Sequence, residues 1–238
     1  MANCNNSAEA RGRSLTAAIP VCVFAKPPIP GQVKTRLAPV LGQIEAARLA
    51  SAMLCDVWDV VRSVAGVVPV LAAAQSGQFG IGVPSDRIWL QQPGDLGSRI
   101  EGILRRGLQR GSAAIALGAD SPLLRPEHLE EALQCLEEND AVLGPAHDGG
   151  FYLLGVRDCP SGLLADLPWS SSETCRETDR RLQMHGMRVA IITSLFDVDT
   201  PAELGLLRSQ LEQLSLEIAP YTRKWLNENS WSALSFRR

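Results

Sequence analysis

The sequence predicts a doubly wound, mostly parallel α/β sheet with helices on both faces. Short apolar runs alternate along the chain with amphipathic patterns of helical spacing, and the segments that connect them are short. Alternation of this kind is typical of open α/β sheets. Glycines and charged residues gather directly after several of the apolar runs. Because ligands of open α/β sheets bind beyond the carboxyl ends of the strands, these positions predict one shared crevice.

The first strand and the basic loop behind it are the strongest part of this pattern. Residues 19–25 (IPVCVFA) form a continuous apolar run, as expected of a buried parallel strand, and Lys26 ends it. A segment punctuated by Pro and Gly then carries Lys34 and Arg36 before an Ala- and Leu-rich run resumes at Leu41. The pattern indicates a strand, a basic loop and a helix. Three cations in the crevice predict an anionic ligand.

The middle of the chain continues the alternation of strands and helices. Gly66 ends a long amphipathic helix, and a Gly-containing segment, GDLGSR, opens another helix after a short strand. The expected elements are a helix over 43–63, strands over 67–74 and 87–92, a helix from 94–99 to Arg110, and a strand over 113–117.

Helix caps mark the C-terminal half. The serine cluster at 170–172 is expected to cap a polar helix that Gly186 stops, and Thr200 forms a capping box with Glu203. The expected elements are helices over 126–137, over 170–185 and from Ala202, and strands over 140–144, 151–156 and 188–193.

The chain is expected to hold one α/β domain, residues 18–212. Its 238 residues, of which 45% are hydrophobic, suffice for one sizeable core. Residues 1–17 are polar and without periodicity, so we expect a disordered tail. Residues 213–238 hold Trp225, Trp231 and Phe236 in a polar setting, and we expect a helical extension folded back on the surface.

The overall charge and the cysteines exclude several classes of protein. A formal net charge of -3 and a pI near 5.7 give no general attraction to nucleic acid or to an anionic membrane. No apolar run approaches the length of about 20 residues that a membrane span needs. The six cysteines show no CxxC pair and no zinc-ligand spacing, which favours reduced thiols. The sequence therefore predicts a cytoplasmic protein and leaves its oligomeric state open.

Carboxylates follow three of the later strands. Asp120 follows the fourth strand, Asp148 the fifth, and Asp197 and Asp199 the last. Facing the cations of the basic loop, they describe a site where aspartates hold a divalent cation while Lys and Arg neutralise a polyphosphate. Simpler roles stay open for each residue, because Asp120 and Asp199 also suit the caps of a turn and of a helix.

Six segments together resemble one known family. They are FAKPPIPGQVKTRLAPVLG, QQPGDLGSRI, GADSPLL, DAVLGPAHDGGFYLLGV, PWSS and FDVDTPAEL, within residues 19–207. In order and spacing they resemble the bacterial GT-A-like glycosyltransferases, which are similar to the phospholactate and molybdenum-cofactor guanylyltransferases. The resemblance implies a nucleotide-diphospho-sugar transferase fold and leaves the substrate open.

The resemblance also implies roles for individual residues. The fourth strand ends in one carboxylate, Asp120, where sugar transferases of this superfamily carry Asp-x-Asp, and this difference leaves nucleotidyl transfer open. Asp148 is the candidate general base, because it is the strand-end carboxylate that the metal does not need. By the resemblance, Lys26, Lys34 and Arg36 bind the nucleotide phosphates, Gly97 and Arg99 lie near the nucleoside, Asp120, Asp199 and Asp197 form the metal site, and Gly149 and Gly150 line the acceptor side with Asp148.

We therefore expect a metal-dependent transferase that uses Mg or Mn and a nucleotide-activated donor. The main expectation is a glycosyltransferase that takes a nucleotide sugar and a small-molecule acceptor. The alternative enzyme is a guanylyltransferase-like nucleotidyltransferase, which takes a nucleoside triphosphate and releases pyrophosphate. A nucleotide-binding protein without catalysis is the alternative from another class, and the carboxylates at the strand ends count against it.

Overall fold

The computed structural model describes residues 18–229. The expected N-terminal tail, Cys4, Trp231 and Phe236 lie outside these residues. Within them, one sheet has the strand order β3-β2-β1-β4-β6-β5-β7, and β6 alone runs antiparallel to its neighbours. The strands are β1 (Ile19–Ala25), β2 (Val67–Ala73), β3 (Ile88–Leu90), β4 (Ala114–Gly118), β5 (Ala141–Pro145), β6 (Phe151–Val156) and β7 (Val189–Ile191).

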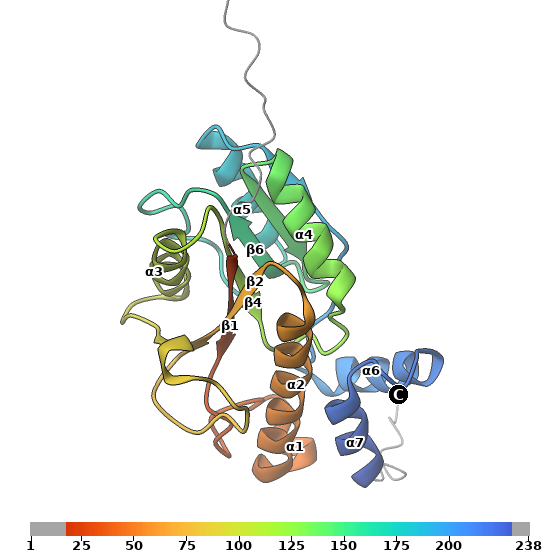
Figure 1. Ribbon diagram of the computed structural model, residues 1–238. Helices are drawn as coiled ribbons and strands as arrows, with labels where there is room; N and C mark the ends of the chain where they lie inside the picture. Colours follow the sequence, from red (N-terminus) through yellow and green to blue (C-terminus); the bar gives the residue numbers. More distant parts are fainter. Residues whose placement is uncertain (1–17, 230–238) are drawn as a thin grey trace, which may run out of the picture.

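The helices cover both faces of the sheet, as Figure 1 shows, and the predicted fold class is confirmed. On one face, α2 (Gln43–Ser63) and α4 (Pro126–Glu138) bury apolar side chains against alternate residues of the strands. On the other face lie α3 (Leu96–Leu108) and α5 (Thr174–Met184). The alternation follows from strand geometry, since successive side chains point to opposite faces. Thus Val21 and Val23 pack on the α2 side, while Cys22 packs on the α3 side.

Two C-terminal helices, α6 (Pro201–Gln213) and α7 (Pro220–Glu228), lie beside α2 (Figure 1). Trp225 of α7 is buried in a cluster with Leu49 and Met53 of α2. The Asp56 carboxylate of α2 accepts hydrogen bonds from the backbone N–H groups of Tyr221 and Thr222, both at 2.9 Å. A buried carboxylate of α2 therefore caps the first turn of α7.

Several shorter features complete the described chain. A four-residue helix, α1 (Ala38–Leu41), precedes α2, and a 3-10 turn, η1 (Ser85–Arg87), precedes β3. The five cysteines of this part of the chain are free thiols. Among residues 18–229, no helix is both long enough and apolar enough to cross a membrane.

One predicted helix cap is wrong and another is confirmed. The α5 helix begins at Thr174 rather than at the serines, and Glu173 occupies its cap position without a capping side chain. The serines instead form a tight turn, in which the Thr174 hydroxyl donates to the carbonyls of Pro168 and Ser171. At α6 the capping box is confirmed: Thr200 Oγ1 accepts from Glu203 N, and Glu203 Oε2 accepts from Thr200 N.

The strand order reverses between β1 and β4. From β1 the chain builds outwards to β2 and β3, and it then returns to place β4 on the opposite side of β1. At such a reversal the loops leaving the two strands diverge and open a crevice at their carboxyl ends. Lys26 directly follows β1, and Ala119 and Asp120 directly follow β4.

Candidate active site

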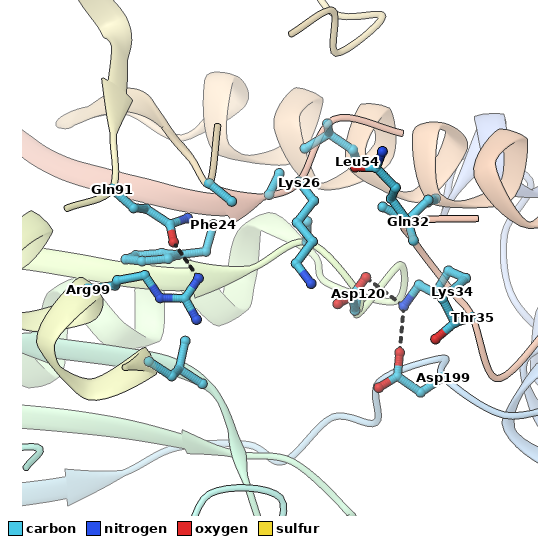
Figure 2. A pocket seen from close by; sticks show the side chains of 16 residues that line it. Phe24, Lys26, Gln32, Lys34, Thr35, Leu54, Gln91, Arg99, Asp120 and Asp199 are labelled. Atoms are coloured by element: carbon cyan, nitrogen blue, oxygen red, sulfur yellow. Dashed lines mark hydrogen bonds and ion pairs between the residues drawn. The ribbon is translucent and has the colours of Figure 1, made fainter. Parts of the chain in front are cut away.

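A cavity of about 410 Å³ lies at this reversal point, within the size range of small-molecule sites (Figure 2). Its walls come from the loop after β1, from the end of β4, from the start of α3 and from the loop before α6. Five predicted site residues line it: Lys26, Lys34, Arg99, Asp120 and Asp199. Residues that are far apart in the sequence thus lie around one cavity, as their positions after the strands predicted.

Lys34 binds two carboxylates at one end of the cavity. Its Nζ lies 2.6 Å from Asp120 Oδ1 and 2.8 Å from Asp199 Oδ1, and its side chain is 4% exposed. Burial alone would lower the pKa of Lys34, but the two carboxylates outweigh it and raise that pKa. Lys34 is therefore a fixed cation. Figure 2 shows Lys26, which is exposed, pointing into the space between these carboxylates and Arg99.

The loop holds Lys34 in place through its backbone. Lys34 has φ of 46°, an uncommon conformation for a residue other than Gly, and its carbonyl accepts from the N–H groups of Leu37 and Ala38. Leu37 is fully buried beside α2 and anchors the turn. Leu37 thus packs the basic loop against the core, and the Lys34 side chain of this loop is buried rather than solvated.

A divalent cation fits the two carboxylates. Asp120 and Asp199 both contact the same ammonium, so one ion can reach both, and their side chains are 49% and 46% exposed. Within residues 18–229, no group of three or more His, Cys, Asp or Glu side chains is arranged to hold a metal. Mg²⁺ is commonly held by one or two carboxylates together with substrate phosphates. The pair therefore suits an ion that arrives with a nucleotide.

The opposite end of the cavity is built by Phe24, Gln91 and Arg99 (Figure 2). Gln91 Nε2 donates to the Ala72 carbonyl at 2.7 Å, and Arg99 Nη1 donates to Gln91 Oε1 at 3.4 Å. Asp95 caps α3 by accepting from Ser98 N at 2.8 Å, and hydrogen bonds from the Ser98 side chain and backbone lower the pKa of Asp95. Sequence reasoning missed Gln91, although it directly follows the third strand and so met the strand-end rule.

Two predicted nucleotide-binding residues do not line the cavity. Arg36 is exposed and is not among the residues that line the cavity. Gly97 lies in the first turn of α3, where an added Cβ would come within 2.3 Å of the Leu164 carbonyl oxygen. The glycine is explained by the close approach of these two segments, and its predicted role near the nucleoside stays a prediction.

A second cavity, of about 290 Å³, adjoins the first and shares Phe24, Leu96 and Asp120 with it. Asp148, Gly150 and Asp197 line this second cavity rather than the first. The Asp197 carboxylate accepts a short hydrogen bond from the Ser121 hydroxyl. Burial raises the pKa of Asp197 to about 6, and the nearby Asp120 and Asp148 charges act in the same direction.

Gly149 keeps the turn before β6 close to the start of α5. It has φ of 90°, and a Cβ there would lie 2.2 Å from the Ser172 Cα. Its carbonyl accepts from Cys175 N at 2.8 Å. Of the two glycines predicted to line the acceptor side, Gly150 borders the second cavity and Gly149 positions the turn.

Comparisons with known proteins agree with the fold. The bacterial family DUF2064, described as an uncharacterized protein conserved in bacteria, matches residues 50–171. Phosphoenolpyruvate guanylyltransferase of Streptosporangium roseum is 34% identical over 188 residues, which cover 72% of this chain and 77% of that protein. 2-Phospho-L-lactate guanylyltransferase of Methanopyrus kandleri is 31% identical over 182 residues, which cover 73% of this chain and 84% of that protein.

Solved structures share the architecture. A protein from Desulfovibrio desulfuricans G20, named as a nucleotide-diphospho-sugar transferase, superposes with a TM-score of 0.81 at 25% identity, over 90% of this chain and 95% of that one. A CMP:2-keto-3-deoxy-manno-octonic acid synthetase complexed with CTP superposes with a TM-score of 0.52 at 17% identity, over 83% of this chain and 99% of that one. At this identity the likeness shows a shared fold alone.

Proposed function

The chain belongs to the DUF2064 family and is related in sequence to guanylyltransferases, and from this premise we propose that it is a nucleotidyltransferase. In the proposed reaction, a nucleoside triphosphate donates its nucleoside monophosphate to a phosphate group on a small acceptor. The observation that carries the proposal is a cavity with two chemically different ends. Gln91 and Arg99 form one end, and Lys26, Lys34, Asp120 and Asp199 form the other.

The proposed donor is GTP. The relatives are named as guanylyltransferases, and Arg99 offers planar N–H donors of the kind that bind the O6 and N7 acceptors of guanine. The contact of Arg99 with Gln91 fixes the direction of these donors. Phe24 beside them supplies an apolar wall for a base.

The phosphates then lie at the Lys26 and Lys34 end. Lys26 is exposed, so its ammonium can move to contact a phosphate. Lys34 neutralises Asp120 and Asp199, which would otherwise repel that phosphate. Asp120 and Asp199 are the residues that would hold a divalent cation. When bound, such an ion neutralises negative charge on the phosphate oxygens during transfer.

The proposed chemistry needs no strong base. An oxygen of the acceptor phosphate attacks the α-phosphorus, a new phosphorus–oxygen bond forms, and the bond to the β-phosphate breaks with pyrophosphate taking the electron pair. Because the second pKa of a phosphate monoester lies near 6, the attacking oxygen is already ionised at neutral pH. Asp148, the candidate general base, is therefore free to orient the acceptor.

Glycosyl transfer, the main expectation from the sequence, is the second candidate. It is favoured by the superposition on the Desulfovibrio protein, which is named as a nucleotide-diphospho-sugar transferase. In that reaction an acceptor hydroxyl attacks the sugar, a nucleoside diphosphate leaves, and Asp148 would act as the base. The identity of the leaving group separates the two candidates.

Isothermal titration of GTP into Asp120→Asn tests the proposed phosphate end. With Mg²⁺ present, we expect binding about tenfold weaker than in the unaltered protein, since a charged contact contributes about 1.5 kcal/mol. With EDTA, binding should be unchanged or tighter, because the carboxylate then only repels phosphate. Asp86→Asn, at an exposed position on η1, is the matched control. Weaker binding that is equal with Mg²⁺ and with EDTA would remove Asp120 from the proposed metal site.

A further inference from the structure

The second cavity meets the first at the place where transfer would occur. Asp120, Ala119 and Phe24 line both cavities. A molecule in the second cavity would therefore approach the phosphate end of a nucleotide in the first. If the chain is a nucleotidyltransferase as proposed, this second cavity is the acceptor site.

Aromatic side chains form one wall of the second cavity. Phe151 and Trp169 lie edge to face, with their ring centroids 6.0 Å apart and their planes at 61°. Trp169 is held by the turn that precedes α5, whose Thr174 hydroxyl binds the Pro168 carbonyl at 2.6 Å. Aromatic faces of this kind bind the C–H surface of a ring or chain, and their negative faces do not attract an anionic group.

The polar groups of the second cavity suit hydroxyls. Asp148 Oδ1 accepts from Gly150 N at 2.8 Å, and no hydrogen bond of residues 18–229 engages its Oδ2. Ser171 Oγ accepts from Glu173 N at 3.2 Å and keeps its own O–H to donate. Carboxylates accept strong hydrogen bonds from hydroxyls, and serines both donate and accept.

The charge of the second cavity excludes a carboxylate on the acceptor. Asp148 and Asp197 line it together with Asp120, whose charge Lys34 balances from the first cavity, and none of its lining residues within the described chain is Lys or Arg. An acceptor carboxylate would meet like charges without a cation to bind it, and this would weaken binding strongly. The acceptors in the names of the guanylyltransferase relatives, phosphoenolpyruvate and phospholactate, both carry a carboxylate.

We infer that the acceptor of this protein is the phosphate ester of a sugar or polyol that carries no carboxylate. Its phosphate reaches the Lys26 and Asp120 end, while its hydroxyls bind Asp148 and Ser171 and its carbon skeleton lies against Trp169. The inference rests on the proposed nucleotidyl transfer and names its acceptor class.

A matched pair of acceptors tests the inference. D-Glycerol 3-phosphate and 3-phospho-D-glycerate differ only in a CH₂OH group in place of a carboxylate. With GTP and Mg²⁺, pyrophosphate release should show kcat/KM at least about tenfold higher for glycerol 3-phosphate, and glucose 1-phosphate should also be a substrate. A preference for 3-phospho-D-glycerate or for phosphocholine, or turnover with neither member of the pair nor glucose 1-phosphate, would overturn the acceptor class.

A parallel measurement separates this failure from failure of the proposed function. Stabilisation of the protein by GTP with Mg²⁺ is read from thermal unfolding, without any acceptor. If GTP stabilises the protein and only the acceptor pattern is wrong, the acceptor inference alone fails. If no nucleoside triphosphate stabilises it, the proposed nucleotidyl transfer fails as well.

Two variants at Trp169 test the aromatic wall. Trp169→Leu should raise the KM for glucose 1-phosphate about tenfold and leave the KM for GTP unchanged, while Trp169→Phe should keep both near the original values. Equal changes in both KM values would indicate a general structural defect. No change in either would remove Trp169 from the acceptor site.

Discussion

Lys34 shows how a single residue organises the candidate site. Its ammonium joins Asp120 and Asp199, and Lys34 and Asp199 are 165 positions apart in the sequence. Sequence reasoning placed all three near one anion because each follows a strand or a basic loop. It could not predict that they bind one another, since that contact depends on how three separate loops fold over the sheet edge.

Replacing Lys34 should affect both stability and binding. In Lys34→Met the two carboxylates lose their shared cation, and we expect the free energy of unfolding to fall by about 1 to 2 kcal/mol. The loss stays below that of a fully buried pair because both carboxylates are half exposed. Urea unfolding measures the loss.

Lys26→Met is the matched control for this change. Lys26 lines the same cavity but is exposed, so its replacement should weaken GTP binding and leave the free energy of unfolding unchanged within about 0.5 kcal/mol. If Lys34→Met is as stable as the unaltered protein, the ion pairs of Lys34 do not hold the site together.

At the scale of elements, helix starts position the site residues. Asp199 precedes α6, and its N–H donates to Glu203 Oε2 at 2.8 Å, the same oxygen that accepts from Thr200 N. The sequence predicted this start because a capping box is a local signal. The serine cluster before α5 misled the same reasoning, because the serines form a turn in which Ser172 lies close to Gly149, and the helix begins only at Thr174.

Removing the capping carboxylate should loosen Asp199. Glu203→Ala leaves two N–H groups without their acceptor, and we expect a loss of about 1 kcal/mol in the free energy of unfolding together with weaker binding of GTP and Mg²⁺. Glu203→Gln keeps an acceptor and should restore most of both. Glu212→Ala, at an exposed position of α6, is the control. Full GTP affinity in Glu203→Ala would show that this cap does not position Asp199.

At the scale of the whole molecule, the reversal of strand order decides where the site lies. The predicted α/β alternation and the strand-end rule located the crevice, because both follow from periodicity and sheet topology alone. The division into two cavities was beyond sequence reasoning, since it depends on side chains of several elements. The attachment of α7 to α2 was also missed, although Asp56 falls among the apolar positions of α2 that are buried.

The attachment of α7 predicts a pH dependence of stability. Burial raises the pKa of Asp56 from 3.8 to about 6, against the opposing effect of its hydrogen bonds with Thr222 and Tyr221. A carboxyl with a raised folded-state pKa contributes stability that is present below about pH 4 and is lost as the pH rises through about 6.

Comparison with Asp56→Asn isolates this contribution. The free energy of unfolding of the unaltered protein, relative to that of Asp56→Asn, should fall by about 2 to 3 kcal/mol between about pH 4 and pH 7. Urea unfolding at a series of pH values measures both. Parallel curves for the two proteins would contradict a raised pKa at Asp56.

The fate of labelled phosphorus tests nucleotidyl transfer most directly. The protein is incubated with Mg²⁺, GTP labelled at the α-phosphate or at the γ-phosphate, and a mixture of sugar phosphates, glycerol 3-phosphate and phospho-carboxylates. We predict that the α-label enters a new nucleoside diphosphate derivative of the acceptor while the γ-label leaves as pyrophosphate. If labelled GTP is left unchanged, and the protein releases GDP in a parallel incubation with a GDP-sugar and the same acceptors, the reaction is glycosyl transfer and the central claim is wrong.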